Sequence, residues 1–102
     1  MSLKKQYLKT KPVCKVTFRV PKELGKGADS VQLVGDFNKW DTQKTPMKKL
    51  KNGSFTITLD LPINQEYQFR YLLNQNIWEN DWDADKYIPS GISSSENSVV
   101  VV

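Results

Sequence analysis

The sequence contains no histidine and one cysteine, Cys14. The missing histidines exclude Ser-His-Asp and Cys-His catalysis and leave the common zinc sites without their usual ligands. A single cysteine excludes an internal disulfide, which is typical of a protein from a reducing compartment. Cys14 lies in an alternating strand pattern, so we expect it to be a small buried hydrophobic residue rather than a reactive group.

Long hydrophobic runs are also missing. The longest aliphatic run is the four valines at 99–102, whereas a membrane-spanning helix needs about 20 apolar residues. The first residues, MSLKKQY, contain no apolar stretch typical of a secretory signal peptide. We therefore expect an intracellular, cytoplasmic protein that has no membrane partner.

Arginine is scarce, although the chain is basic. The net charge is +4, but residues 1–51 carry +9 and residues 52–102 carry −5. Such asymmetry indicates either a face that binds polyanions or lysines that keep a small β domain soluble and protect its edges. Arg19 and Arg70 are the only arginines, and arginine is the usual reader of phosphates and base edges. We therefore favour the second interpretation and expect no nucleic-acid partner.

Alternating apolar and polar residues predict half-buried strands at 13–20, 54–61 and 66–73. In the last of these, alternate residues from Tyr67 to Leu73 face the core, and Gln68, Arg70 and Leu72 face outward. Shorter strands are expected at 30–35, around 47–50, at 77–79 and at 98–102, with a hairpin at Asn52-Gly53 and no convincing helix.

About seven short strands with frequent turn signals predict an all-β fold, an antiparallel β-sandwich. The 102 residues suit one domain. We place this single domain at residues 12–102, preceded by a lysine-rich N-terminal arm at 1–11 that is partly ordered at best. Residues 80–97 are expected to be irregular.

An acidic run, Glu79, Asp81, Asp83 and Asp85, resembles the start of a calcium-binding loop. Such a loop requires glycine at its sixth position and a bidentate glutamate at its twelfth. With Asp81 as the first position, this chain has Lys86 and Ile92 there. We expect solvated carboxylates or partners for nearby lysines, and therefore no metal and no cofactor. A glycosidase acid pair is equally weak, because it needs two carboxylates across a cleft.

Two tryptophans lie in polar surroundings. Trp40 is in an otherwise polar loop, and Trp78 follows a turn among Asn and Glu. Sugar rings present a flat C–H face that stacks on an exposed indole, and flanking polar side chains then hydrogen-bond the hydroxyls. We expect Trp40 to be exposed, whereas for Trp78 exposure and core packing stay open. We interpret Trp82 as structural.

The stretch 31–40, VQLVGDFNKW, resembles the signature that opens carbohydrate-binding module family 48. Further features follow in family order: Pro46-Met47, Asn52-Gly53, residues 67–71, Trp78 and the final strand from Asn97. The family includes the glycogen-binding domain of the AMP-activated protein kinase β subunit and the N-terminal early-set domain of isoamylases and glycogen branching enzymes. The resemblance, which covers about residues 13–102, implies an immunoglobulin-like early-set sandwich that binds α-1,4-glucans.

The resemblance also implies the site. Trp40 and Trp78 match the family's two stacking platforms, Arg70 its basic hydrogen-bonding residue, Asn97 its asparagine on the last strand, and Ser95, more loosely, its hydroxyl residue. Two departures concern the loop at 82–95. Ser93 replaces the family's leucine, and Asp81-Trp82 replaces the usual Asp-Pro.

We therefore expect a noncatalytic module with no catalytic residues, which binds glycogen, starch or maltooligosaccharides. A glucan-active enzyme or another protein is a further expected partner, because the module is usually attached to a catalytic or regulatory domain. The alternative is a protein-interaction or regulatory module that kept the fold and lost sugar binding. A basic nucleic-acid binder and a minimal glycosidase are the weaker rivals.

Overall fold

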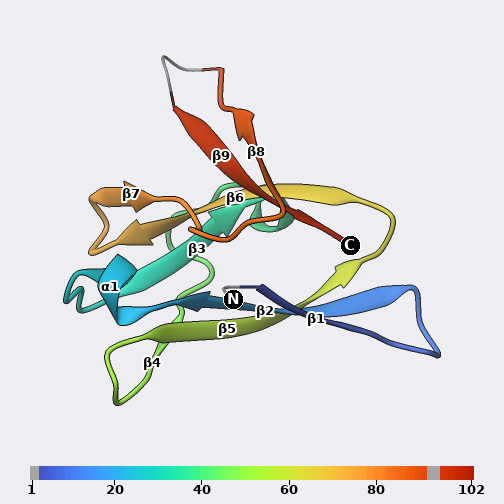
Figure 1. Ribbon diagram of the computed structural model, residues 1–102, viewed down its shortest axis with the longest axis horizontal. Coiled ribbons are helices and arrows are strands. Elements are labelled where there is room, and N and C mark those ends of the chain that lie inside the picture. Colours follow the sequence, from blue (N-terminus) through green and yellow to red (C-terminus); the bar gives the residue numbers. More distant parts are fainter. Residues whose placement is uncertain (1–2, 92–94) are drawn as a thin grey trace.

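The computed structural model describes residues 3–91 and 95–102. Two antiparallel sheets pack face to face (Figure 1), and the predicted all-β immunoglobulin-like sandwich is confirmed. The described part contains nine strands where the sequence predicted about seven. Its two helices are four and three residues long, so no helix there is long enough to cross a membrane.

The first sheet, here called sheet A, has the strand order β1-β2-β5-β4. Its strands are β1 (Leu3–Tyr7), β2 (Val13–Val20), β5 (Phe55–Pro62) and β4 (Lys48–Lys49). The alternating pattern of β2 directs Cys14, Val16, Phe18 and Val20 into the interior, where each is fully buried. The prediction for Cys14 is thereby confirmed, and its thiol is free.

The second sheet, sheet B, has the order β3-β6-β9-β8, and β7 also pairs with β6. Its strands are β3 (Val31–Gly35), β6 (Glu66–Leu73), β7 (Ile77–Glu79), β8 (Lys86–Pro89) and β9 (Glu96–Val101). The inner face of β6 presents Tyr67, Phe69, Tyr71 and Leu73 to the core, as predicted. Aromatic rings join the two sheets, since the centroid of Phe18 lies 5.1 Å from that of Phe69.

Three segments differ from the sequence-based expectation. The N-terminal segment, expected to be an arm, contains β1, which pairs with β2 along its whole length and buries Leu3. No convincing helix was expected, but the chain forms the short helix α1 (Lys22–Gly25) after β2. The irregular region expected at 80–97 contains β8, an edge strand whose partner β9 supplies the pairing that its own sequence does not reveal.

The two strands at the end of sheet B diverge from the sheet in Figure 1, where β8 and β9 rise together away from β6. β9 pairs with β6 over residues 66–69, and β7 pairs with the same edge of β6 over residues 71–73, since β3 occupies the other edge. This arrangement leaves a concave region on the outer face of sheet B, where β9 separates from β6 and β7 takes its place.

Candidate functional site

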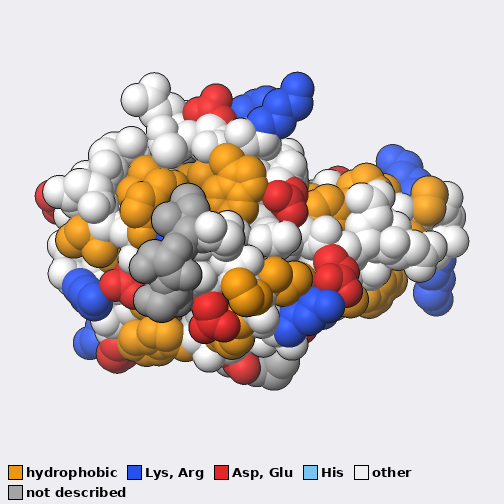
Figure 2. Space-filling view, turned by 90° about the horizontal axis from the view of Figure 1, so that it is seen from above, with side chains coloured by type: hydrophobic (Ala, Val, Ile, Leu, Met, Phe, Trp, Pro, Cys, Tyr) orange, Lys and Arg blue, Asp and Glu red, His pale blue; other side chains and the backbone are white. Residues whose placement is uncertain are grey.

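A hollow of about 500 Å³ lies on the outer face of sheet B. Eight residues line it: Asp36, Trp40, Gln68, Arg70, Trp78, Ser90, Ser95 and Asn97. The structure therefore brings together all five side chains that the sequence singled out. Figure 2, which looks at the sheet B side, shows hydrophobic side chains gathered on this face.

Trp40 reaches the hollow through an unusual turn. β3 ends at Gly35 and is followed by the short helix η1 (Asp36–Asn38). Gly35 has an extended backbone, but a Cβ at this position would lie 2.5 Å from the carbonyl oxygen of Gln68. Glycine is therefore required here by the close approach of the end of β3 to β6 rather than by its torsion angles.

The side chain of Asn38 holds this turn together. It is buried, and its Oδ1 accepts a hydrogen bond from the backbone N–H of Gly35 at 3.1 Å. Its Nδ2 donates to the carbonyl oxygen of Leu33 at 2.8 Å and to the hydroxyl of Thr45 at 2.9 Å. Because these bonds tie η1 to β3 and to Thr45, Asn38 acts on the architecture rather than on a ligand.

Trp40 itself has a left-handed backbone. Its φ is 57° and that of Lys39 is 58°, a region that costs a residue with a side chain on the order of 1–2 kcal/mol. The backbone N–H of Trp40 donates to the carbonyl oxygen of Gly35 at 2.9 Å, which fixes the turn. An indole kept on strained backbone at the rim of a hollow points to a functional role.

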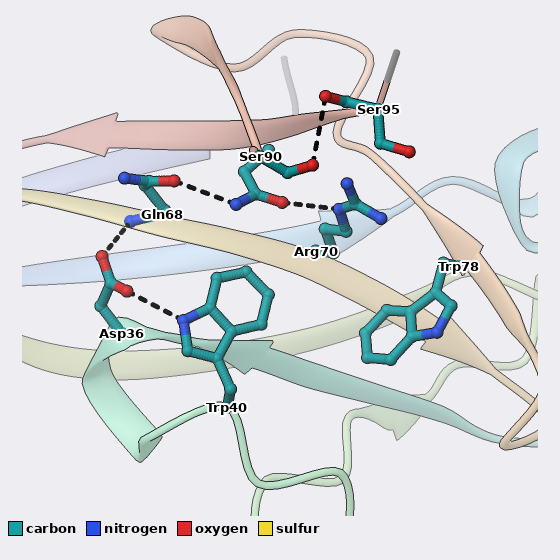
Figure 3. A pocket seen from close by; sticks show the side chains of 8 residues that line it. Asp36, Trp40, Gln68, Arg70, Trp78, Ser90 and Ser95 are labelled. Atoms are coloured by element: carbon teal, nitrogen blue, oxygen red, sulfur yellow. Dashed lines mark hydrogen bonds between the residues drawn. The ribbon is translucent and has the colours of Figure 1, made fainter. Parts of the chain in front are cut away.

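A chain of hydrogen bonds runs across the floor of the hollow (Figure 3). Arg70 Nε donates to Asn97 Oδ1 at 2.7 Å, and Asn97 Nδ2 donates to Gln68 Oε1 at 2.9 Å. The backbone N–H of Gln68 donates to Asp36 Oδ2 at 2.7 Å, and Trp40 Nε1 donates to Asp36 Oδ1 at 2.9 Å. The network joins the indole of Trp40 to the guanidinium of Arg70 and limits the rotamers of both.

Trp78 lies on the other side of Arg70 from Trp40 (Figure 3). It faces outward from β7, directly opposite Leu72 of β6. Its side chain is 43% exposed, whereas Trp40, which was expected to be exposed, is half-buried. Leu72 faces outward as predicted but is 3% exposed, so the outer face of the sheet is covered at this point.

Asn80 closes the gap between β7 and β9. Its Nδ2 donates to the carbonyl oxygen of Glu96 at 2.9 Å, and its Oδ1 accepts from the backbone N–H of Ser98 at 3.0 Å. These are bonds that a strand would make, so one side chain replaces the missing neighbour where β9 leaves β6. The backbone of β9 is thus held in place beside Asn97.

Ser90, which follows β8, and Ser95, which precedes β9, line one wall of the hollow. The carbonyl oxygen of Ser95 accepts from the backbone N–H of Ser90 at 3.0 Å and from its hydroxyl at 3.2 Å. Ser95 therefore lines the site, as the resemblance implied. Ser93, where the chain departs from the family pattern, lies outside the described residues.

The interpretation of Trp82 as structural was wrong. Trp82 is 59% exposed and does not line the hollow. The structural residue is its neighbour Asp81, which is 1% exposed and accepts a hydrogen bond from Tyr71 Oη at 2.6 Å. Burial, followed by the negative charge of Asp81, raises the pKa of Tyr71 well above its usual value.

Two other members of the acidic run bind lysines, as predicted. Glu79 pairs with Lys26 at 2.6 Å and Asp85 with Lys5 at 2.7 Å. No group of three or more His, Cys, Asp or Glu side chains within 3–91 and 95–102 is placed to hold a metal ion. The buried Asp81 was not expected, because a run of alternating acids gives no sign that one of them turns inward.

Three lining residues were missed from the sequence. Gln68 carried a usable signal, because it shares the outward face of β6 with Arg70. Asp36 had a weaker one, its position immediately before the short helix that leads to Trp40. Ser90 had none, because its place depends on the β8–β9 pairing that the sequence did not predict.

The arrangement suits a neutral, flat, polyhydroxylated ligand: two indole faces flank a row of amide and guanidinium groups. The family model that matches the chain is carbohydrate-binding module 48 (isoamylase N-terminal domain), over residues 14–88. The match includes Trp40, Arg70 and Trp78 and ends before Ser95 and Asn97. A comparison with curated proteins gives no match.

Proposed function

The chain belongs to the carbohydrate-binding module 48 family, and from that premise we propose that its hollow binds α-1,4-glucans such as glycogen, starch or maltooligosaccharides. The observation that carries this proposal is the position of Trp40 and Trp78 on the two sides of Arg70 in one hollow. Each indole offers an apolar face to the C–H side of a glucose ring, where contact and attraction to the ring's negative face act together.

The polar groups between the indoles supply direction. The guanidinium of Arg70 has five N–H donors, of which Nε is used on Asn97. Asn97 and Ser95 add an amide and a hydroxyl, groups that exchange hydrogen bonds with sugar hydroxyls in either sense. Because the network already orders Arg70 and Asn97, a glucan would lose less side-chain entropy on binding than at a site of free side chains.

We propose that the module is noncatalytic. Among the described residues that line the hollow, Asp36 is the one acid, and its two oxygens accept from Trp40 and Gln68. A glycosidase requires two carboxylates facing each other at about 5–9.5 Å. Incubation with glycogen, starch or pullulan should therefore release no reducing sugar; release that disappears in an Asp36→Asn variant would overturn this part of the proposal.

Affinity electrophoresis in gels with and without glycogen tests the binding. Wild type should be retarded by glycogen, and Trp40→Ala and Trp78→Ala should each weaken retardation about tenfold or more. Loss of an aromatic platform costs on the order of 1–3 kcal/mol, by analogy with base stacking. Trp82→Ala is the matched control, because it removes an exposed indole outside the hollow and should migrate as wild type.

The same gels separate the alternative. A folded wild type that glycogen does not retard would favour a protein-interaction module that has lost sugar binding. A Trp40→Ala variant whose urea midpoint of unfolding lies far below that of wild type would show that the indole belongs to the core. A glucan-active enzyme is the partner that we propose for the module if glucan binding holds, since the module would then bring such an enzyme to its substrate.

A further inference from the structure

The outer face of sheet A carries a second, chemically different surface. Strand alternation and pairing place nine polar or charged side chains on this side of the sandwich, opposite the hollow: Lys4, Gln6, Lys15, Thr17, Arg19, Lys48, Thr56, Thr58 and Asp60. This set is here called the basic face. Val13 and Pro62 pair with each other at one end of the same side, but none of the nine members of the basic face is aromatic or aliphatic.

The charge asymmetry of the sequence becomes a spatial one in the fold. The strands of sheet A contain six lysines or arginines and one carboxylate, Asp60. The strands of sheet B contain two cations and three carboxylates. Lys5 and Lys49 alternate to the other side of the sheet, but the remaining four cations lie on the basic face, where they create a directed field.

Most of this charge is not neutralised within the chain. Asp60 pairs with Lys15 at 3.1 Å. Lys4, Arg19 and Lys48 make no ion pair with any carboxylate in the described part of the chain. All three are exposed, so an external anion can reach each of them without first breaking an internal pair.

The basic face is also hollowed. A depression of about 290 Å³ is lined by Lys4, Gln6, Lys15, Thr17 and Thr58. All five side chains can donate hydrogen bonds, and no carboxylate lines the depression. The hydroxyls of Thr17 and Thr58 lie 2.9 Å apart and fix each other across β2 and β5. Such a lining suits an oxyanion, and the carboxylates of Asp and Glu are the oxyanions that an unmodified protein surface carries.

We propose that the basic face docks a carboxylate-rich surface of a partner protein. Nucleic acid is disfavoured, since the face has no aromatic side chain on which a base could stack and Arg19 is its one arginine. A four-stranded face with a local depression matches the broad surface of another folded domain better than it matches a single strand of nucleic acid, which binds in a continuous groove.

The size of the face sets the kind of complex. Eight residues along each of two strands and four strands across give an area of at most roughly 500 Å². A standard interface buries about 800 Å² on each partner. The complex should therefore be transient, governed by charge and weakened by salt. Because the face lies opposite the hollow, the proposal does not depend on glucan binding.

Poly-L-glutamate, a soluble acidic polypeptide, is a suitable probe for fluorescence anisotropy at about 50 and 200 mM salt. A variant that combines Lys4→Gln, Arg19→Gln and Lys48→Gln removes three charges from the basic face. Its matched control combines Lys39→Gln, Lys44→Gln and Lys86→Gln, which removes three exposed charges elsewhere. We expect the first variant to lose tenfold or more in affinity at low salt and the control to stay within about threefold of wild type.

Mapping on ¹⁵N-labelled protein adds a second readout. Poly-L-glutamate should shift amide signals of β1, β2 and β5, and leave the indole signals of Trp40 and Trp78 unchanged. Equal losses in the two variants would overturn the proposal, because net charge alone would then explain binding. So would the absence of binding at low salt, or tighter binding of a mixed-sequence oligonucleotide through the same residues. Self-association that disappears in the first variant would identify a second copy, not an acidic partner, as the occupant.

Discussion

The two outer faces of this sandwich are made by the same strand alternation but organised in opposite ways. On the sheet B side, Asp36, Gln68, Arg70 and Asn97 bind one another in a continuous network, and Trp40 sits on a strained turn. On the sheet A side, the bonds are isolated: Lys15 pairs with Asp60, Thr17 contacts Thr58, and the hydroxyl of Thr56 donates to the carbonyl oxygen of Phe18.

The difference indicates two kinds of recognition. Ordered side chains with flat apolar faces favour a neutral ligand of defined shape, since little conformational entropy remains to be lost. Exposed, like-charged side chains favour an oppositely charged surface and fast, salt-dependent encounter. Changes to the sheet B face should therefore alter the fold and glucan affinity, whereas equivalent changes to the sheet A face should leave both nearly unaltered.

Gly35→Ala should have the largest effect. The new Cβ would lie 2.5 Å from the carbonyl oxygen of Gln68 and 2.7 Å from Phe69 Cβ, contacts that real structures do not contain. We expect a loss of about 3 kcal/mol in the free energy of unfolding, at the upper end of the cost of overpacking, measured from urea midpoints. Gly25→Ala is the control, because its Cβ would make ordinary contacts at 3.6 Å or more. Equal stability of the two variants would show that the end of β3 has room for a Cβ beside β6.

The sequence predicted the regular parts of this fold and fewer of its irregular ones. β2, β5 and β6 follow from alternation, because each has one buried and one exposed face. β1 and β8 were missed because an edge strand needs a partner more than a pattern of its own.

The candidate site shows the same division. Trp40 and Trp78 stand out because an indole in a polar stretch is unusual. Their position in one hollow with Asn97 depends on where β9 separates from β6, and this is decided by long-range strand pairing. Trp82 was expected to be structural, but the inward-facing residue of this pair is Asp81, which the sequence pattern presented as a surface acid.

Asp36→Ala should have the next largest effect, on glucan affinity. It removes the acceptor for both Trp40 Nε1 and the backbone N–H of Gln68, so the indole gains rotamer freedom that a ligand must then restrict. We expect glycogen retardation to weaken about fivefold to tenfold. Asp60→Ala, the matched loss of one carboxylate on sheet A, should leave retardation unchanged and stability within about 0.5 kcal/mol, since its ion pair with Lys15 is half exposed. Similar retardation of the two variants would show that Asp36 does not hold Trp40 in position for the ligand.

Backbone strain at Trp40 predicts a smaller effect on stability, in which glycine is better tolerated than alanine. Trp40→Gly should be more stable than Trp40→Ala by about 1 kcal/mol, because glycine adopts a φ of 57° without steric cost. Arg19 lies within a regular strand on sheet A, so there Arg19→Gly should be less stable than Arg19→Ala by about 0.5–1 kcal/mol. Urea unfolding of the four variants measures both differences. The same order at both positions would show that the turn relaxes when the indole is removed.

The smallest effect should be the coupling between the two faces. The hollow and the basic face share no residue and lie on opposite sides of a packed core, so neither ligand should contact the other's site. Glucans are neutral, so maltoheptaose affinity should change less than twofold between about 50 and 200 mM salt, whereas poly-L-glutamate affinity should fall steeply. Saturation with maltoheptaose should change poly-L-glutamate affinity less than twofold, and the reverse must then hold, because coupling between binding sites is reciprocal. Tryptophan emission, which reports on the hollow, and anisotropy of labelled poly-L-glutamate, which reports on the basic face, measure the two affinities in one sample. A mutual change of fivefold or more would mean that the core between the sheets has two arrangements, and that each ligand selects one of them.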